Sequence, residues 1–334
     1  MNGLLKKNNI LFRFSGGKVV GKELGLGHVY RSLNLAQELK KYNLFFLIED
    51  YGNVRKLILE RGFTNIFHLK PRCELKEDTK KTIEIIKEKK INLTIIDKYK
   101  IPASYLKKIN SIVKSVYIAD LWKYDYPADI VVNGFIGLKN QKILNKYGAK
   151  CCLGPKYQIL NRNFQKKKVQ KKRIDLLATF GGFDENNLIK LLIKNYEGEF
   201  SLRIILGFST KINEIKKYQK IFGDNISFLK ETKNMAEEIK KARYGICSGG
   251  ITSYEFACLG VPFAIICQAK HQIQTAKVWD SLGIAKNLGF KNRTISIRLK
   301  QYLRQVNNSN LRINHFKIDG NGSTRVAKEI IKLL

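Results

Sequence analysis

His28 is the residue of this sequence best placed for acid–base chemistry. It stands at the expected start of a helix, after a strand expected over residues 9–14 and a glycine-rich loop. The positive end of a helix dipole favours neutral imidazole, which can accept a proton. We therefore expect His28 to act as a general base, with simple packing or capping at the helix start as the alternative. Arg31, one turn further on, could hold a phosphate or a surface carboxylate.

The loop before His28 could bind an anion or a sugar. Glycines let a ligand approach the backbone closely, and the N–H groups at the following helix start point outward. The spacing fails the G-x-G-x-x-G dinucleotide fingerprint, because Tyr30 stands at its last position. The sequence therefore does not favour a dinucleotide here. The glycines of this loop are Gly16, Gly17, Gly21, Gly25 and Gly27.

A second glycine-containing strand end lies at residues 247–262. Gly249 and Gly250 turn the chain, and a helix is expected to begin near Thr252. The N-terminal amides of that helix could cradle a diphosphate. Thr252 and Glu255 also fit a capping box, in which the glutamate returns to the helix start. Alternatively, the Glu255 carboxylate could accept hydrogen bonds from both hydroxyls of a ribose.

A third strand-to-helix loop has glycines followed by a carboxylate. Gly181 and Gly182 precede Asp184, which looks like an N-cap residue. We expect the two glycines to let a phosphate approach the backbone and Asp184 to cap the next helix.

Polar residues also end two strands of the first half. Asp97 and Tyr99 follow a buried strand at the end where substrate would lie, although strand-end turns also carry such residues for ordinary reasons. Asp120, after the next strand, is a weaker candidate.

Short apolar runs alternate with amphipathic, lysine-rich stretches, which is the pattern of βαβ units with parallel sheets. We expect an α/β fold with two Rossmann-like domains that face each other across a cleft. The expected divisions are an N-terminal domain over 1–160, a basic linker over 161–173, a C-terminal domain over 174–318 and a closing helix over 319–334. Strands are expected at 9–14, 44–49, 65–69, 93–97, 115–119, 129–133, 174–180, 201–206, 225–229, 244–248 and 262–267.

The 334-residue chain has 62 Lys and Arg against 28 Asp and Glu, which gives a formal net charge of +34. Such charge attracts polyanions and anionic lipid headgroups, and its spread along the chain favours a generally basic surface. Six cysteines without a C-x-x-C pair indicate a reducing compartment, and no apolar stretch approaches the length of a membrane span. We expect a cytoplasmic protein that binds no metal, cofactor or nucleic acid. The basic surface is compatible with peripheral contact with an anionic membrane.

Three segments together resemble nucleotide-sugar enzymes of the GT-B superfamily. They are GLGHVYRSLNLAQEL, GGITSYEFACLGVP and HQIQTAKVWDSLGIAKNLG. Within the superfamily the sequence is most similar to the UDP-sugar hydrolase of pseudaminic acid biosynthesis. It is more distantly similar to the lipid-linked N-acetylglucosaminyltransferase of peptidoglycan synthesis.

The resemblance implies a division of labour between the two domains. The amino-terminal domain would hold the sugar and the catalytic histidine, His28, and the carboxyl-terminal domain would hold UDP. The segment IIDKYK resembles a strand-end Asp, His, Tyr sequence of the hydrolase and carries Asp97 and Tyr99 across, with Lys98 where histidine is usual. Together with the motifs above, the residues expected at UDP are Gly249, Gly250, Thr252, Glu255, Gly181 and Gly182, and those expected at the sugar are Gly27, Arg31, Gln272 and Gln274.

The resemblance also implies a reaction. His28 would deprotonate a water that attacks the anomeric carbon of a UDP-linked diacetamido trideoxy sugar and expels UDP with inversion. A glycosyltransferase of the same fold would use an acceptor hydroxyl in place of water. A basic polyanion-binding protein, which the charge alone suggests, is the alternative from another class.

Overall fold

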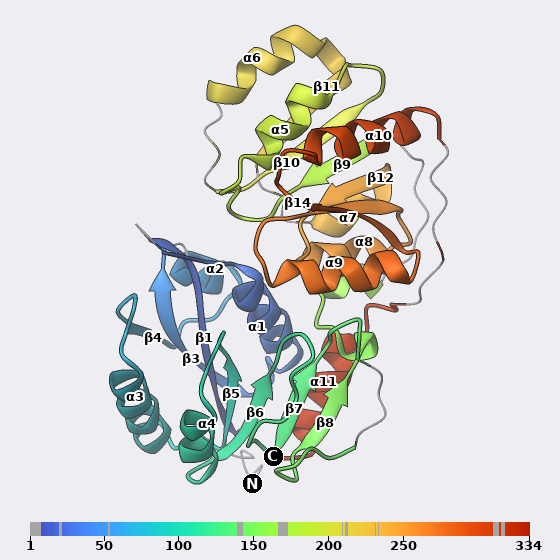
Figure 1. The fold of residues 1–334 in the computed structure, drawn as a ribbon. Helices are drawn as coiled ribbons and strands as arrows, with labels where there is room; N and C mark the ends of the chain where they lie inside the picture. The colour runs from blue at the N-terminus through green and yellow to red at the C-terminus, as the bar shows by residue number, and fades with distance from the viewer. Residues whose placement is uncertain are drawn as a thin grey trace, which may run out of the picture. The chain divides into compact units, whose positions relative to one another are not determined.

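The computed structural model describes residues 8–19, 22–52, 54–138, 143–165, 173–208, 210, 213–230, 232, 234–309, 314 and 318–334. The chain divides into two compact units (Figure 1). The first comprises Met1–Asn161 together with Gly320–Leu334, and the second comprises Arg162–Asp319.

The first unit is built on an eight-stranded sheet whose strand order is β4-β3-β1-β5-β6-β7-β8, with β2 paired to β1. All of these pairs are parallel except the pair of β1 with β2. The carboxyl ends of the parallel strands therefore meet at one edge, where α/β sheets bind ligands. The strands are β1 (Asn9–Val19), β2 (Lys22–Gly25), β3 (Asn43–Tyr51), β4 (Ile66–Leu69), β5 (Leu93–Asp97), β6 (Lys114–Ile118), β7 (Ile130–Asn133) and β8 (Lys150–Leu153).

Helices cover both faces of this sheet. Residues of α3 and α4 pack on one face with Leu11, Leu47 and Ile96 in a continuous buried cluster. On the other side α1 packs against β1 and against α11, the last helix of the chain (Figure 1). In α1, Val29, Leu33 and Ala36 recur at helical spacing and are fully buried, so burial of this stripe holds the helix on the sheet. The helices are α1 (Gly27–Glu38), α2 (Val54–Glu60), α3 (Leu75–Glu88), α4 (Ala103–Asn110) and α11 (Gly322–Ile331).

The second unit has a six-stranded parallel sheet in the order β11-β10-β9-β12-β13-β14. Helices α5 and α10 cover one face of it. Helices α8 and α9 cover the other face (Figure 1). On that face the ring of Phe263 in β13 packs against the rings of Phe256 and Trp279. The strands are β9 (Ile174–Thr179), β10 (Leu202–Leu206), β11 (Ile226–Lys230), β12 (Ala242–Cys247), β13 (Phe263–Cys267) and β14 (Ala285–Phe290), and the helices are α5 (Leu188–Asn195), α6 (Asn213–Phe222), α7 (Met235–Lys241), α8 (Ile251–Cys258), α9 (Gln272–Ser281) and α10 (Ile295–Asn307).

All eleven predicted strands are present, and the α/β prediction is confirmed. The sequence missed β2, β8 and β14, which all lie at sheet edges or off the main strand order. β2 and β8 have only four residues each, and β14 includes Lys286 and Asn287, so none of the three contains a long apolar run.

The prediction that the first strand ends at Phe14 is wrong. β1 continues to Val19 and pairs with β2, so much of the expected glycine loop is a β-hairpin. The register shifts between Gly17 and Lys18, and Gly17 has a φ of 102°. A Cβ at Gly17 would lie 2.7 Å from the carbonyl oxygen of Gly52, so both the backbone conformation and the packing require glycine.

The closing helix and the linker fall at the division between the units. The helix expected over 319–334 is α11, and it packs within the first unit, where the Ser323 hydroxyl donates to the Leu160 carbonyl at 2.5 Å. The expected linker over 161–173 begins with a 3₁₀ turn at Arg162–Gln165, and 166–172 lie outside the described residues. No helix in the described part of the chain is long and apolar enough to span a membrane.

Candidate active site

His28 lies in the first turn of α1 and meets a carboxylate from the end of β5. Its Nδ1 is 2.6 Å from Oδ1 of Asp97. The His28 side chain is 18% exposed and the Asp97 side chain 1%. The strand end buries the aspartate beside the helix start, so a solvent-reachable imidazole is held by a carboxylate that is almost inaccessible.

Asp97 is also held by neighbouring groups of α1. Arg31 donates to both of its carboxylate oxygens, through Nε at 2.9 Å and Nη2 at 2.5 Å. The Ser32 hydroxyl donates to Oδ2 at 3.3 Å, and Arg31 reaches Asp120 through Nη1 at 2.8 Å. The sequence left open whether Arg31 holds a phosphate or a surface carboxylate. In the structure it contacts two carboxylates, of which Asp97 is buried and Asp120 is partly exposed.

The helix dipole is expected to favour neutral His28, whereas the contact with Asp97 favours the charged ring. Burial lowers the pKa of His28, but the charge of Asp97 and its hydrogen bond outweigh burial and raise the pKa above its ordinary value of 6.5. Burial raises the pKa of Asp97, but Arg31 and His28 together hold it down to about 2. Asp97 has this effect on His28 because its carboxylate lies in direct contact with the ring.

Tyr99 and Gly27 lie close to His28 in the first unit. The centroids of the Tyr99 and His28 rings are 6.5 Å apart, and Tyr99 is 43% exposed. Gly27 is the exposed first residue of α1, and a Cβ there would meet nothing within 4 Å. The structure therefore gathers His28, Arg31, Asp97, Tyr99 and Gly27 at the carboxyl edge of this sheet.

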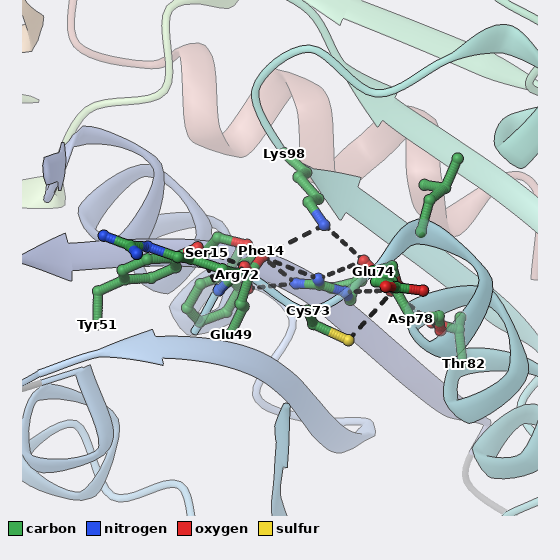
Figure 2. A network of polar contacts seen from close by, with 12 residues as sticks. Phe14, Ser15, Glu49, Tyr51, Arg72, Cys73, Glu74, Asp78, Thr82 and Lys98 are labelled. Carbon is green, nitrogen blue, oxygen red and sulfur yellow. Dashed lines mark hydrogen bonds and ion pairs between the residues drawn. The ribbon is translucent and has the colours of Figure 1, made fainter. Parts of the chain in front are cut away.

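Lys98 points away from this group. Its Nζ is 2.6 Å from Oδ2 of Asp78 and 3.3 Å from Oε2 of Glu49 (Figure 2). The lysine that stands where the resembling sequence has histidine is thus part of an ion-pair network with α3 and β3. Sequence reasoning missed this network, because no local signal connects Arg13, Glu49, Asp78 and Lys98.

In the second unit, Gly249 and Gly250 lie between β12 and α8. Gly250 is the N-cap residue of α8, and no side chain within the described residues caps this helix. The backbone N–H of Gly249 donates to Oε1 of Gln272 at 3.3 Å, and the same oxygen accepts from the N–H of Gln268 at 2.8 Å. Gln272 therefore fixes the loop that leads into α8.

The capping-box alternative for Thr252 and Glu255 is wrong. With Gly250 as the N-cap, Thr252 lies inside the helix and is not placed to cap it. Burial raises the pKa of Glu255 to about 7, and a hydrogen bond with Thr252 lowers it in part. A partly buried carboxyl with this pKa gains from hydrogen-bond donors that favour its charged form.

Gly181 and Gly182 form the loop after β9, next to the loops described above. Gly181 has a φ of 84° and open space where a Cβ would stand. The side-chain amide of Gln268 donates a hydrogen bond to the backbone carbonyl of Phe180, and this bond joins the loops after β9 and β13. Gln268 was not singled out from the sequence.

Asp184 is not the N-cap residue that the sequence predicted, since Asn187 holds that position in α5. The Asp184 carboxylate nevertheless accepts hydrogen bonds from the backbone N–H of Leu188 at 2.7 Å and of Ile189 at 2.8 Å. The first amides of α5 are therefore occupied by this side chain, whereas the start of α8 has no such cap. Gln274 is exposed on the first turn of α9.

The described residues contain no group of three or more His, Cys, Asp or Glu side chains arranged to hold a metal ion. None of the six cysteines, which all lie within the described residues, forms a disulfide bond. His315 lies outside the described residues.

The two units with these strand orders define the GT-B fold. The chain matches the crystal structure of MurG from Acinetobacter baumannii with a TM-score of 0.65 and 16% identity, over 97% of this chain and 99% of that one. It matches CalG4, the calicheamicin glycosyltransferase, with a TM-score of 0.60 and 12% identity, over 99% of each chain. Likeness at these identities establishes the fold and leaves the reaction to the site.

Three proteins show sequence similarity. MJ1062, an uncharacterized protein of Methanocaldococcus jannaschii, is 33% identical over 276 residues, which are 75% of this chain but 54% of that protein. SpsG of Bacillus subtilis, a spore coat polysaccharide biosynthesis protein, is 27% identical over 92% of this chain and 94% of its own length. The UDP-2,4-diacetamido-2,4,6-trideoxy-beta-L-altropyranose hydrolase of Campylobacter jejuni is 24% identical over 80% and 94%.

The chain thus spans about half the length of MJ1062 and nearly all of the other two relatives. No protein-family model matches it. The sequence is a distant relative of the hydrolase and of SpsG, and the fold is that of GT-B proteins.

Proposed function

We propose that this protein is a UDP-sugar hydrolase that releases UDP and free sugar from a UDP-linked diacetamido-trideoxyhexose, in the biosynthesis of nonulosonic acids of the pseudaminic type. The observation that carries the proposal is the contact of His28 with Asp97 at 2.6 Å. The sequence similarity to the Campylobacter jejuni hydrolase supports the choice of sugar.

His28 is the proposed general base. Because Asp97 engages Nδ1, the other ring nitrogen, Nε2, is the one that takes a proton from water. The water oxygen forms a bond to the anomeric carbon while the bond from that carbon to the UDP oxygen breaks, and its electron pair leaves with UDP. One such displacement inverts the anomeric centre. Asp97 stabilises the imidazolium that forms, and base assistance of this kind supplies roughly 10²–10⁴-fold.

The second unit is proposed to bind UDP. The diphosphate would lie at the start of α8, where Gly250 is the N-cap and the helix dipole favours negative charge. Glu255 would accept hydrogen bonds from the ribose hydroxyls, with Thr252 beside it. Gly181 and Gly182 complete the proposed diphosphate contacts. A preorganised positive helix end stabilises the leaving group as charge develops on it.

Within the first unit, the sugar is proposed to contact Gly27 and Tyr99, both of which are exposed. Arg31 and Gln272 were expected there too, but the structure engages both with protein groups. For Arg31 we propose that it holds Asp97 and Asp120 at the edge of the sugar site.

The test is UDP release from the UDP-linked diacetamido trideoxy sugar in ¹⁸O-water without any acceptor, followed by mass spectrometry. Label on the anomeric oxygen of the free sugar is the expected result, together with loss of release in His28→Gln. Label on the phosphate of UDP, or release that persists in His28→Gln, would contradict the mechanism. UDP binding measured by calorimetry in both proteins controls for folding.

A glycosyltransferase is the second candidate. It is favoured by the relationship to SpsG, whose name places it in polysaccharide biosynthesis. The same displacement would occur with an acceptor hydroxyl in place of water. Release of UDP that requires a glycan or lipid-linked acceptor would favour this function over hydrolysis.

A further inference from the structure

The end of β5 presents two consecutive charged side chains to opposite faces of the first sheet. Side chains alternate along a strand, so Asp97 faces α1 and Lys98 faces α3. Asp97 contacts His28 and Arg31 on its side. Lys98 contacts Asp78 at 2.6 Å and Glu49 at 3.3 Å on the other (Figure 2).

Asp78 is a fixed point in this arrangement. Its side chain is fully buried in α3, and Arg13 of β1 donates to both of its oxygens, at 2.9 Å and 2.6 Å. The Thr82 and Tyr105 hydroxyls lie within 3.3 Å and 3.2 Å of Oδ1. Burial raises the pKa of Asp78, but Arg13 and Lys98 bring it down to about 2, so it remains a carboxylate.

Glu49 is held as firmly from β3. Its Oε2 accepts from the Ser15 hydroxyl at 2.9 Å, and its Oε1 accepts from the Tyr51 hydroxyl at 2.5 Å. The backbone N–H of Arg72 adds a third donor at 2.9 Å. The network therefore joins β1, β3, α3 and the loop before α3 (Figure 2), and the contacts of Asp78 and Glu49 with Arg13, Ser15 and Tyr51 do not involve Lys98.

Lys98 connects the end of β5 to this network. Its side chain is only 17% exposed and lies between two carboxylates, with Arg13 as the other buried cation. Two cations and two carboxylates balance in charge, as buried ion pairs must to offset the cost of desolvation. The pair fixes the backbone at Lys98, and Asp97 is the adjacent residue.

We propose that Lys98 is a positioning residue, whose ion pairs with Asp78 and Glu49 hold the end of β5 so that Asp97 meets His28 and Arg31. The proposal rests on the proposed role of His28 in the reaction. Lys98 stands where the resembling sequence has histidine. In this proposal it acts from the face of the sheet opposite the sugar site.

If the charge of Lys98 is removed, a positioning role and a purely electrostatic role predict opposite changes in the pKa of His28. The charged and titratable groups that face His28 are Asp97, Arg31, Asp120 and Tyr99. Removing a cation without moving anything would raise the pKa of His28 slightly. If the end of β5 moves instead, Asp97 withdraws and the pKa of His28 falls.

The test is Lys98→Met in the full chain, with the histidine Cε1–H resonances titrated by NMR and His28 assigned from the spectrum of His28→Gln. We expect the pKa of His28 to fall, kcat to drop by about 10- to 100-fold, and the affinity for UDP to stay the same. Lys98→Arg keeps the charge and should recover most of both properties. Lys81→Met, which removes the exposed pair with Glu84 on α3, is the matched control.

The double variant Lys98→Met with Glu49→Gln separates the ion-pair contact from charge balance. It keeps the network neutral and folded, so a low pKa of His28 that persists in it supports positioning. A pKa of His28 that is unchanged or raised in Lys98→Met, or restored in the double variant, overturns the proposal. Because the titration needs no turnover, a wild-type protein that fails to hydrolyse the UDP-sugar would refute the proposed function and leave this result readable.

Discussion

A carboxylate shared between a histidine and an arginine dominates the candidate active site. Asp97 is almost fully buried and contacts both His28 and Arg31. It raises the proton affinity of the ring and at the same time fixes which ring nitrogen faces outward. A stronger base with a defined tautomer suits proton removal from water, but only above the pKa of His28 is the ring free to accept.

Asp97→Asn tests this balance. Asparagine cannot raise the pKa of His28, and Arg31 would then oppose protonation, so the pKa falls. Turnover should rise with pH through the pKa of His28 in the wild type, and this acid limb should move to lower pH in the variant. The maximal rate should fall by about 100-fold or more, because the imidazolium loses its partner.

The measurement is a pH–rate profile of UDP release for both proteins. Asp120→Asn is the matched control. Asp120 also raises the pKa of His28, but it pairs with Arg31 and acts on the ring through charge alone, so the shift of the pKa should be smaller. An acid limb that stays in place in Asp97→Asn would show that His28 is not the titrating base.

Glu255 makes a second prediction about pH. Burial raises its pKa to about 7, so it is mainly protonated below this pH and charged above it. Ribose hydroxyls donate best to the charged form, and UDP affinity should therefore increase as pH rises through 7. Calorimetry with UDP between pH 6 and 8 measures this, and Glu255→Gln should remove the part of the dependence that comes from the carboxyl. Equal pH dependence in the two proteins would argue against ribose binding by Glu255.

The residue types at the site could be predicted from the sequence, but not their partners. His28 and Asp97 stand out because each marks the end or the start of an element. Their contact spans 69 positions along the chain, so no local pattern reveals it. Lys98 follows Asp97 directly, so the two side chains point to opposite faces of the sheet. Which face each one meets is known only once the neighbouring strands and helices are known.

Among the secondary-structure elements, the start of α8 differs from the start of α5. Asp184 occupies the first amides of α5, whereas α8 begins at Gly250 without a side-chain cap in the described residues. The sequence could predict both glycine-containing loops, because strand, glycine and helix follow in order. It could not predict which helix start stays available to an anion, since that depends on how Asp184 folds back.

Gly250→Ala tests the helix start as the diphosphate site. A Cβ at Gly250 would meet nothing within 4 Å, so the free energy of unfolding should change by less than about 1 kcal/mol. The methyl group would, however, stand where the diphosphate approaches, and UDP affinity should fall about tenfold or more. Calorimetry and thermal melting measure the two effects separately.

Gly260→Ala, at the other end of the same helix, is the control. Gly260 has a φ of 66°, so alanine there should cost about 1 kcal/mol of stability and leave UDP affinity unchanged. The two variants should thus show opposite patterns. Unchanged UDP affinity in Gly250→Ala would place the diphosphate elsewhere.

For the chain as a whole, the first unit is closed by its last residues. α11 packs against α1, the helix that carries His28, although the entire second unit lies between them in the sequence. The helix itself was predictable from its apolar spacing. Its place was not, because an amphipathic stripe shows that a helix docks but not on which surface.

Ile330→Ala tests the dependence of the first unit on α11. Ile330 is fully buried, so its truncation should lower the stability of the first unit by about 2–5 kcal/mol. Loss of this helix loosens α1, and the pKa of His28 should move back toward that of a free histidine. The second unit should still bind UDP, because it has its own core. Calorimetric melting of the full chain measures the stability of the first unit, and UDP titration measures the affinity for UDP. Lys328→Ala, at an exposed position of the same helix, is the control. Loss of UDP binding at temperatures where only the first unit has melted would show that the two units do not act as separate folding and binding bodies.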